Sequence, residues 1–192
     1  MESLRVLIAD DESIRLMSLN TQLTALGHRV VAEAPNGEEA VSLAEIARPD
    51  LAILDIRMPG MDGIEAAELI TQSRPIPIIL LTAYSDEQLV TRATHTSISA
   101  YLMKPVAEDD LLPAISLALT RFRQFQALQQ EVTDLKEALE SRKIVERAKG
   151  ILMRRLGLSE EEAFRRLQRQ SQDTNRRLAE VAQALITADQ LL

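Results

Sequence analysis

Polar side chains that could do chemistry follow several short apolar runs in the first part of the chain. Asp10 and Asp11 come directly after one such run, Asp55 follows another, and Thr82 and Lys104 follow two more. If the runs are parallel strands, these side chains lie together, because ligands of open parallel sheets bind outside the carboxyl ends of the strands. Three carboxylates repel one another unless a cation lies between them, and Mg²⁺ suits a set of oxygen ligands. The sequence therefore predicts a magnesium site at one edge of a sheet.

A lysine and a hydroxyl group beside such a metal could hold an anion. An anion that meets both Mg²⁺ and a carboxylate is typically a phosphoryl group. Asp55 is the expected nucleophile, forming an aspartyl phosphate, because it ends the central apolar run. Asp10 and Asp11 are then expected to be metal ligands. Each acid taken singly could also be an ordinary solvated carboxylate at a strand end, and it is the matched set of five positions that favours a site.

The elements that must position these side chains alternate between strands and helices. Continuous apolar character is typical of strands that are covered on both faces. Such runs occupy residues 6–8, 30–31, 51–54, 78–81 and 100–102. Amphipathic segments predict helices at 13–26, 37–47, 63–73, 86–96 and from 108 onward. This order predicts an α/β domain with a doubly wound, five-stranded parallel sheet.

These residues resemble the receiver domain of two-component response regulators, over residues 1–120. The resemblance rests on Asp10-Asp11, on Asp55 within Leu-Asp-Ile-Arg-Met-Pro-Gly-Met-Asp-Gly, on Thr82-Ala83 and on Lys104-Pro105. It implies a flavodoxin-like fold in which Asp55 accepts phosphate from a sensor histidine kinase. A receiver catalyses only its own phosphorylation and dephosphorylation. The resemblance therefore implies a regulator, not an enzyme with a small-molecule substrate.

The receiver resemblance also assigns the metal and phosphoryl contacts. It implies that Lys104 contacts the phosphoryl oxygens. The Mg²⁺ ligands that it implies are Asp10, Asp11, Asp55 and the backbone carbonyl of Arg57.

A switch and a cis peptide bond are implied in the same way. Thr82 and Tyr101 match the switch pair, in which the hydroxyl moves to the phosphate and the aromatic ring turns inward. Plain packing at a strand end is the alternative for Tyr101. The bond that precedes Pro105 is expected to be cis, since only X-Pro bonds adopt that form at low cost. His28 and His95 do not belong to the motif and are expected at surface or loop positions.

Charge divides the chain into two parts. The whole sequence of 192 residues has a formal charge of −7, which on its face argues against a nucleic-acid binder. Residues 1–120 carry −10 and residues 121–192 carry +3, with +6 concentrated in residues 142–177. The net charge of the whole chain is therefore the sum of an acidic part and a basic part, and the basic part could bind nucleic acid.

A helix is expected to continue beyond the first domain. Up to about residue 119 it is expected to pack on its own domain. Over residues 121–140, an apolar residue recurs at alternating spacings of four and three, as at the a and d positions of a short coiled coil. This pattern predicts dimerisation or packing against a partner helix through Leu128, Val132, Leu135 and Leu139.

Residues 141–192 predict a small bundle of three helices, at 141–156, 160–171 and 175–189. Ser159 and Glu162 have the spacing of a capping box at the start of the second helix. The segments 142–153, 159–167 and 175–182 resemble the ANTAR domain, with Ala-Lys-Gly-Ile-Leu-Met as the most specific element. The resemblance implies a dimer that binds paired hairpins in nascent transcripts and prevents transcription termination. One departure is Ser171-Gln172, where the family usually has Ala-Met.

The basic side chains of this bundle are the candidates for contact with RNA. Recognition of RNA favours exposed loop bases and phosphates, because side chains enter the A-form major groove poorly. Phe164 has the spacing of a core residue and is expected to pack inside. The candidate contacts are Arg142, Lys149, Arg154, Arg155, Arg165, Arg166, Asn175, Arg176 and Arg177.

Two other output classes remain open at this point. Gly157-Leu158-Ser159 could be the turn of a DNA-binding helix-turn-helix, which would make the chain a DNA-binding regulator with the same receiver. The basic side chains could also be a solvated face of a protein-interaction module.

The expected protein is soluble and cytoplasmic. No apolar run approaches the ~20 residues that a membrane span needs, so no membrane partner is expected. The sequence contains no Cys, which excludes disulfides and thiolate chemistry. Together the receiver and ANTAR resemblances imply a phosphorylation-dependent antiterminator that forms a homodimer when phosphorylated.

Overall fold

The computed structural model describes residues 3–83 and 98–190. The chain divides into two compact units, Met1–Gln126 and Ala127–Leu192. The division falls within one helix, α5 (Glu108–Leu156). Domain limits at residues 120 and 140 stay a prediction.

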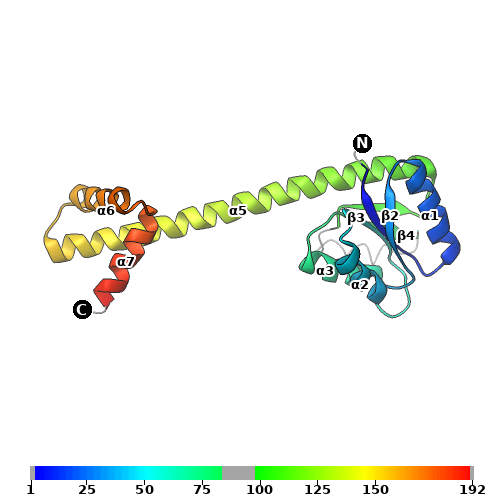
Figure 1. The fold of residues 1–192 in the computed structure, drawn as a ribbon, viewed down its shortest axis with the longest axis horizontal. Helices are drawn as coiled ribbons and strands as arrows, with labels where there is room; N and C mark the ends of the chain where they lie inside the picture. Colours follow the sequence, from blue (N-terminus) through cyan, green and yellow to red (C-terminus); the bar gives the residue numbers. More distant parts are fainter. Residues whose placement is uncertain (1–2, 84–97, 191–192) are drawn as a thin grey trace. The chain divides into compact units, whose positions relative to one another are not determined.

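The first unit is built on a five-stranded parallel sheet (Figure 1). The order β2-β1-β3-β4-β5 places the reversal of strand order between β1 and β3, which is where ligands bind in doubly wound folds. Both β3 and β4 are buried along their whole length, which explains their continuous apolar character. The predicted sheet is confirmed. Its strands are β1 (Arg5–Ala9), β2 (Arg29–Ala34), β3 (Leu51–Asp55), β4 (Ile78–Thr82) and β5 (Ala100–Met103).

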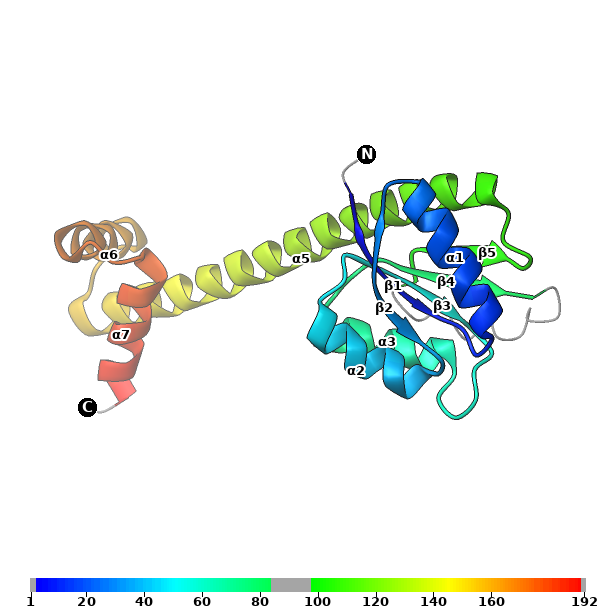
Figure 2. The ribbon, with the colours of Figure 1, turned by 45° about the vertical axis from the view of Figure 1, so that its right-hand side comes forward.

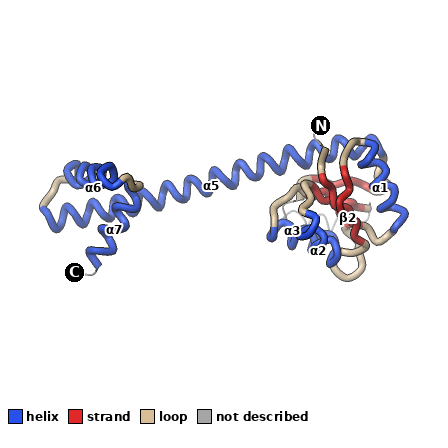
Figure 3. The backbone as a smooth tube through the Cα atoms, in the orientation of Figure 1, coloured by secondary structure: helices blue, strands red, loops and turns tan. Residues whose placement is uncertain are grey.

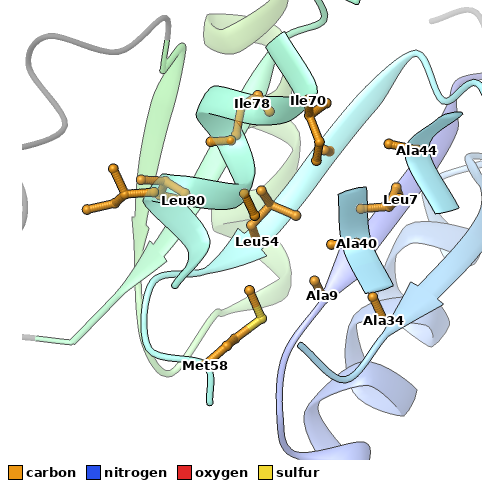
Figure 4. Close-up of a cluster of buried hydrophobic side chains, with 14 of the residues drawn as sticks. Leu7, Ala9, Ala34, Ala40, Ala44, Leu54, Met58, Ile70, Ile78 and Leu80 are labelled. Carbon is orange, nitrogen blue, oxygen red and sulfur yellow. The ribbon is translucent and has the colours of Figure 1, made fainter. Parts of the chain in front are cut away.

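Helices cover both faces of this sheet (Figure 3). On one face α2 (Gly37–Ala47) and α3 (Gly63–Ser73) bury a cluster that includes the sheet residue Leu54 (Figure 4). On the other face α1 (Ser13–Ala25) and the first turns of α5 bury a second cluster around Ile53. The helix expected at residues 86–96, with His95, lies outside the described residues.

The second unit is a small bundle in which α6 (Glu160–Thr174) turns back along the last turns of α5, and α7 (Leu178–Gln190) crosses them (Figure 2). Its core joins Ala148 and Ile151 of α5 to Leu167 of α6 and to Ala182 and Ile186 of α7. The prediction of three helices is correct, but the predicted start of a separate helix at residue 141 is wrong. That segment is the continuation of α5, because no Gly or Pro interrupts the chain between Pro113 and Gly150.

The ends of the bundle helices are defined by specific side chains. Gly157 follows α5 with a φ of 66°. The Ser159 hydroxyl accepts a hydrogen bond from the Glu162 backbone, and the Glu162 carboxylate accepts one from the Ser159 backbone, so the predicted capping box is confirmed. In the described part of the chain, no helix combines the length and apolar character that crossing a membrane requires.

Candidate functional site

Three carboxylates meet where the strand order reverses. Asp10 and Asp11 follow β1, and Asp55 is the last residue of β3, the neighbouring strand. One carboxylate oxygen from each lies within 4.8 Å of the others. Asp10 and Asp55 are buried, whereas Asp11 is exposed, so the cluster opens to solvent on one side. These hard oxygen donors fit Mg²⁺, which commonly keeps several of its water ligands.

Lys104 joins this cluster from the end of β5. Its ammonium Nζ lies 2.5 Å from Asp55 Oδ2 and 2.9 Å from Asp10 Oδ2. Thr82, the last residue of β4, is also buried, and its hydroxyl donates to the carbonyl of Ala83 at 3.2 Å. The Lys104–Pro105 peptide bond is cis. The structure thus brings to one edge all five polar residues that the sequence singles out.

Burial acts on the ionisation of the central carboxylate. Desolvation raises the pKa of Asp55 above its ordinary value, and the neighbouring charge of Asp10 acts in the same direction. The ammonium of Lys104 and the backbone N–H of Arg57 act against this shift by stabilising the carboxylate. An aspartate must be ionised to attack phosphorus, so cations beside Asp55 favour its reactive form. The Arg57 carbonyl as a metal ligand stays a prediction.

Arg15 is a second cation at this cluster that sequence reasoning missed. It lies in the first turn of α1, and its Nη1 is 3.5 Å from Asp10 Oδ1 and 3.9 Å from Asp55 Oδ2. Its Nη2 is anchored by Glu12 at 2.7 Å. Position alone gave no signal, because Arg15 follows no strand and reaches the site only through its long side chain.

Replacing Arg15 by Gln is expected to tighten the binding of Mg²⁺. The guanidinium and a bound metal would compete for the carboxylates of Asp10 and Asp55, and a partly exposed ion pair of this kind is worth roughly 0.5–1 kcal/mol, or about a two- to fivefold change in affinity. Titration calorimetry with Mg²⁺ measures it. Arg29→Gln removes the same charge from an exposed position on β2 and serves as the control. Equal or weaker affinity in the Arg15 variant would contradict the competition.

The remaining receiver positions have defined surroundings. Tyr101 is partly buried against the core cluster beneath α2 and α3, and this burial raises the pKa of its phenol. Its role as a switch stays a prediction. His28 lies between α1 and β2 as a loop residue, but it is not at the surface: it is buried, accepts a long hydrogen bond from the backbone N–H of Leu4, and has its pKa lowered by desolvation.

An exposed apolar stripe runs along the middle of α5. Leu128, Val132, Leu135 and Leu139 are 40–63% exposed, with Phe125 one step before them. Large aliphatic side chains in such a row are typical of a surface that another chain covers. The structure thus leaves the predicted dimerisation residues accessible, and dimerisation itself stays a prediction.

The seven arginines among the candidate RNA contacts fall into two groups. Several already pair with acids at the surface, as Arg155 does with Asp189, Arg165 with Glu161 and Arg176 with Glu180. In the part of the chain that the structure describes, no ion pair involves Arg142, Arg154, Arg166 or Arg177. One further cation, Arg169, borders a hollow along α6 together with Arg165 and Arg166. Its position one helical turn after Arg165 was a readable signal that sequence reasoning missed.

Lys149 differs from the other candidates because it is buried. Its ammonium is 2.8 Å from Glu146 on the same helix and 2.7 Å from Glu160 at the start of α6. It also lies 6.0 Å from the centre of the Phe164 ring, which is within cation–π range. These contacts tie α5 to α6 and leave the charge of Lys149 little access to an RNA phosphate.

Replacing Lys149 by Met is expected to make the stability of the bundle less sensitive to acid. The hydrogen bond from Lys149 lowers the pKa of Glu160. A lowered carboxyl pKa contributes stability that is present above the ordinary glutamate pKa and is lost as pH falls through the lowered value. The variant lacks this contribution. Hydrogen exchange of the Ile151 and Leu152 amides in the full chain, at neutral pH and at about pH 3, measures the difference.

The matched control is Lys143→Met, which removes an exposed pair with Glu140 on the same helix. The control should respond to acid as the unaltered chain does. An identical acid response in both variants would show that the pair between α5 and α6 adds nothing.

Asn175 and Ser171 form the turn that leads from α6 to α7. Asn175 ends α6 in the left-handed region with a φ of 52°, a conformation that Asn tolerates well. The Ser171 hydroxyl donates to the carbonyl of Arg176 at 2.5 Å, and the backbone N–H of Arg176 donates to the Ser171 carbonyl at 3.1 Å. The departure from the family pattern at Ser171 therefore adds a hydrogen bond that Ala could not make.

Comparison with known proteins covers both units. The response regulator receiver domain model matches residues 6–116, and the ANTAR domain model matches residues 133–186. The transcriptional regulatory protein PdtaR of Mycobacterium tuberculosis (strain ATCC 25618 / H37Rv) is 49% identical over 180 residues, which cover 92% of this chain and 88% of that protein. The transcriptional regulatory protein AfsQ1 of Streptomyces coelicolor is 43% identical over 53% of this chain and 44% of its own length.

Solved structures resemble the first unit. The signal receiver domain of a modulated diguanylate cyclase from Desulfovibrio desulfuricans G20 has a TM-score of 0.60 and 36% identity, covering 64% of this chain and 98% of that one. The CheX-CheY-BeF3-Mg+2 complex from Borrelia burgdorferi has a TM-score of 0.55 and 30% identity, over 58% of this chain and 85% of that one.

Proposed function

The chain belongs to the response regulators that join a receiver domain to a C-terminal ANTAR domain, and from this premise we propose that it is a phosphorylation-dependent antiterminator that binds hairpins in nascent RNA. The observation that carries the proposal is that one chain holds both an acidic cluster paired with a partly buried lysine, Lys104, and an ANTAR bundle with a basic surface. The receiver implies a kinase as phosphodonor, and the ANTAR domain implies RNA as the target. We place the protein in the cytoplasm, where nascent transcripts are made.

The first step of the proposal is phosphorylation of Asp55. One Asp55 carboxylate oxygen attacks the phosphorus of the phosphodonor, and the donor atom leaves with the bonding electrons. Lys104 lies beside the attacking carboxylate, and its ammonium group would contact the phosphoryl oxygens once the group is transferred. Asp10 and Asp11 would hold Mg²⁺, which offsets negative charge on the transferred group when it is bound. This chemistry on its own Asp55 is the only catalysis that we propose.

The second step is pairing of two chains through the apolar stripe of α5. Val132 at an a position and Leu128 and Leu135 at d positions favour a two-stranded parallel coiled coil. In such a dimer Glu131 at g faces Lys136 at e of the partner helix, a favourable charge pair. Pairing brings two bundles together and raises the effective concentration of the second bundle at a second hairpin. Thr82 and Tyr101 are proposed to relay phosphorylation to this surface.

Comparison of RNA and DNA binding tests the proposed output. The full chain, treated with a small phosphodonor and Mg²⁺, is titrated with a pool of two-hairpin RNAs with randomised loops and with duplex DNA of the same stem sequence, over a range of salt concentrations. We expect the RNA to bind about tenfold or more tightly than the DNA at physiological salt. A polycation without specificity would bind both, with affinity that falls steeply with salt for each. Equal binding would refute RNA recognition, and preference for DNA would support a DNA-binding regulator instead.

A further inference from the structure

An open cavity of about 310 Å³ lies among the three helices of the bundle. Its apolar wall includes Leu152 of α5, Leu167 of α6 and Val181 and Leu185 of α7. Leu152, Leu167 and Val181 belong to the buried core, so the cavity opens the core itself toward solvent. Its volume is at the lower end of the range for small-molecule sites, which suits one flat ring system and not a helix.

Two guanidinium groups border this apolar cavity. Arg166 comes from α6 and Arg176 from the turn before α7. In the described ranges Arg166 enters no ion pair, and the pair of Arg176 with Glu180 is long, at 3.4 Å, with both side chains half exposed. Arg166 also borders the next hollow along α6, which adds Arg165 and Arg169. The acids Glu162 and Asp173 also line this second hollow, so the cations exceed the acids there by one, and Arg166 is the cation that the two hollows share.

A side-chain amide lies on the same wall. Gln170 borders the cavity as well as the hollow along α6. Its amide takes part in no side-chain hydrogen bond among the residues that the structure describes. An amide offers both a donor and an acceptor, which is what the edge of a nucleobase requires. The cavity thus combines an apolar floor, one amide and flanking cations.

A single unstacked nucleotide has the matching chemistry. Its base is a flat ring system with little charge, and a phosphate lies on each side of it along the strand. Proteins that recognise RNA in loops splay out such bases and bind them individually. An apolar peptide side chain would fill the floor but would leave the two guanidinium groups without an anion.

We propose that this cavity binds one unstacked base of an RNA loop, with Gln170 at the base edge and with Arg166 and Arg176 at the flanking phosphates. The proposal rests on the RNA-binding function above and deepens it, because it names the subsite and the part of the RNA that enters it. The base is held by packing against aliphatic side chains. No aromatic residue of the described chain borders the cavity.

Filling the cavity from α7 tests this subsite in the full chain. Ala184 is exposed and borders the cavity, so the side chain of Ala184→Leu would occupy the space of the base. Ala188→Leu is the matched control, one helical turn later and outside the cavity. Ala184 and Ala188 both border a third hollow, with Ile144, so an effect of that surface appears equally in the two variants. Leu is a good helix former, so both variants are expected to stay folded, and thermal unfolding checks this.

The probe is the tightest-binding hairpin from the randomised-loop RNA pool, compared with versions that lack one loop base at a time. Removal of one particular base should weaken binding to the unaltered chain about tenfold, which is the size expected when the hydrogen bonds of one base edge are lost. Ala184→Leu should weaken binding of the intact hairpin by a similar factor and should make removal of that base inconsequential. Ala188→Leu should behave as the unaltered chain.

The outcomes separate the subsite from the function. If the unaltered chain binds RNA but Ala184→Leu binds it equally well, the cavity is not the base site and the RNA-binding function stands. Ala184→Leu could also weaken binding while each base deletion still costs the same affinity in the variant as in the unaltered chain. That result would likewise exclude the cavity as the base site. If the unaltered chain binds RNA no more tightly than DNA, the proposed RNA-binding function is refuted, and the base subsite is refuted with it. A change in self-association with unchanged RNA affinity would assign the cavity to a protein contact instead.

Discussion

Replacing Asp55 by Asn is expected to abolish phosphate-dependent dimerisation and the gain in RNA affinity that depends on it. An amide cannot attack phosphorus as a carboxylate does, and the substitution removes one of the three carboxylates that would hold Mg²⁺. A bivalent complex can exceed the affinity of its single modules by about 10²–10⁴. The variant should therefore bind a two-hairpin RNA at least about tenfold more weakly after treatment with phosphodonor. Intact mass, sedimentation velocity and RNA titration give the three readouts.

Two control variants locate the cause of any loss. Asp109→Asn removes an exposed carboxylate at the start of α5 and should leave every readout unchanged. Leu135→Lys interrupts the apolar stripe away from the acidic cluster, so it should accept phosphate but remain monomeric. Dimerisation of Asp55→Asn on addition of phosphodonor would refute the switch. Equal RNA affinity of the unaltered chain with and without phosphorylation would also refute the switch.

Replacing Gly63 by Ala is expected to produce the largest loss of stability in the receiver. A Cβ at this position would lie 2.0 Å from the carbonyl oxygen of Asp55 and 3.2 Å from the Cα of Ile56. The backbone N–H of Gly63 also donates to the Ile56 carbonyl at 3.0 Å, so neither segment can move away freely. Overpacking typically costs about 1–3 kcal/mol, and a contact this close to backbone atoms places the substitution at the upper end of that range. Urea unfolding measures the cost, and phosphorylation should slow as well because Asp55 is displaced.

Gly150→Ala is the matched control for this substitution. A Cβ there would meet only the end of the Arg154 side chain, at 3.5 Å, which is ordinary contact. Since Gly lies inside α5, Ala should stabilise the bundle by about 0.5–1 kcal/mol. If Gly63→Ala proved as stable as Gly150→Ala, the tight contact with Asp55 would be disproved.

The receiver could be predicted from sequence because its signals are local. Continuous apolar runs gave the strands, and polar residues placed directly after them had to meet at one edge of a parallel sheet. The helix boundary at residue 141 could not be predicted in the same way. The basic segment that begins at Arg142 looks like a new element, but helix propensity continues through it without a breaker.

The roles of Arg15 and Lys149 could not be predicted from local sequence patterns, because both depend on tertiary contacts. Arg15 reaches the acidic cluster through its side chain, and nothing in the spacing of residues reveals that reach. Lys149 is basic and lies within a basic segment, so composition assigned it to the RNA surface. The pairing with Glu146 was visible as a spacing of three, but the second pair, with Glu160, depends on how α6 folds back. Tertiary packing decides which of the charged residues remain available.

The turn around Ser171 and Asn175 has a consequence for the energetics of binding. Its two hydrogen bonds fix the backbone that carries Arg176 and Arg177 when the bundle folds. The conformational entropy of that backbone is thus already lost before any ligand arrives. An anionic ligand that meets these arginines has to immobilise their side chains alone, which is the advantage of a preorganised site.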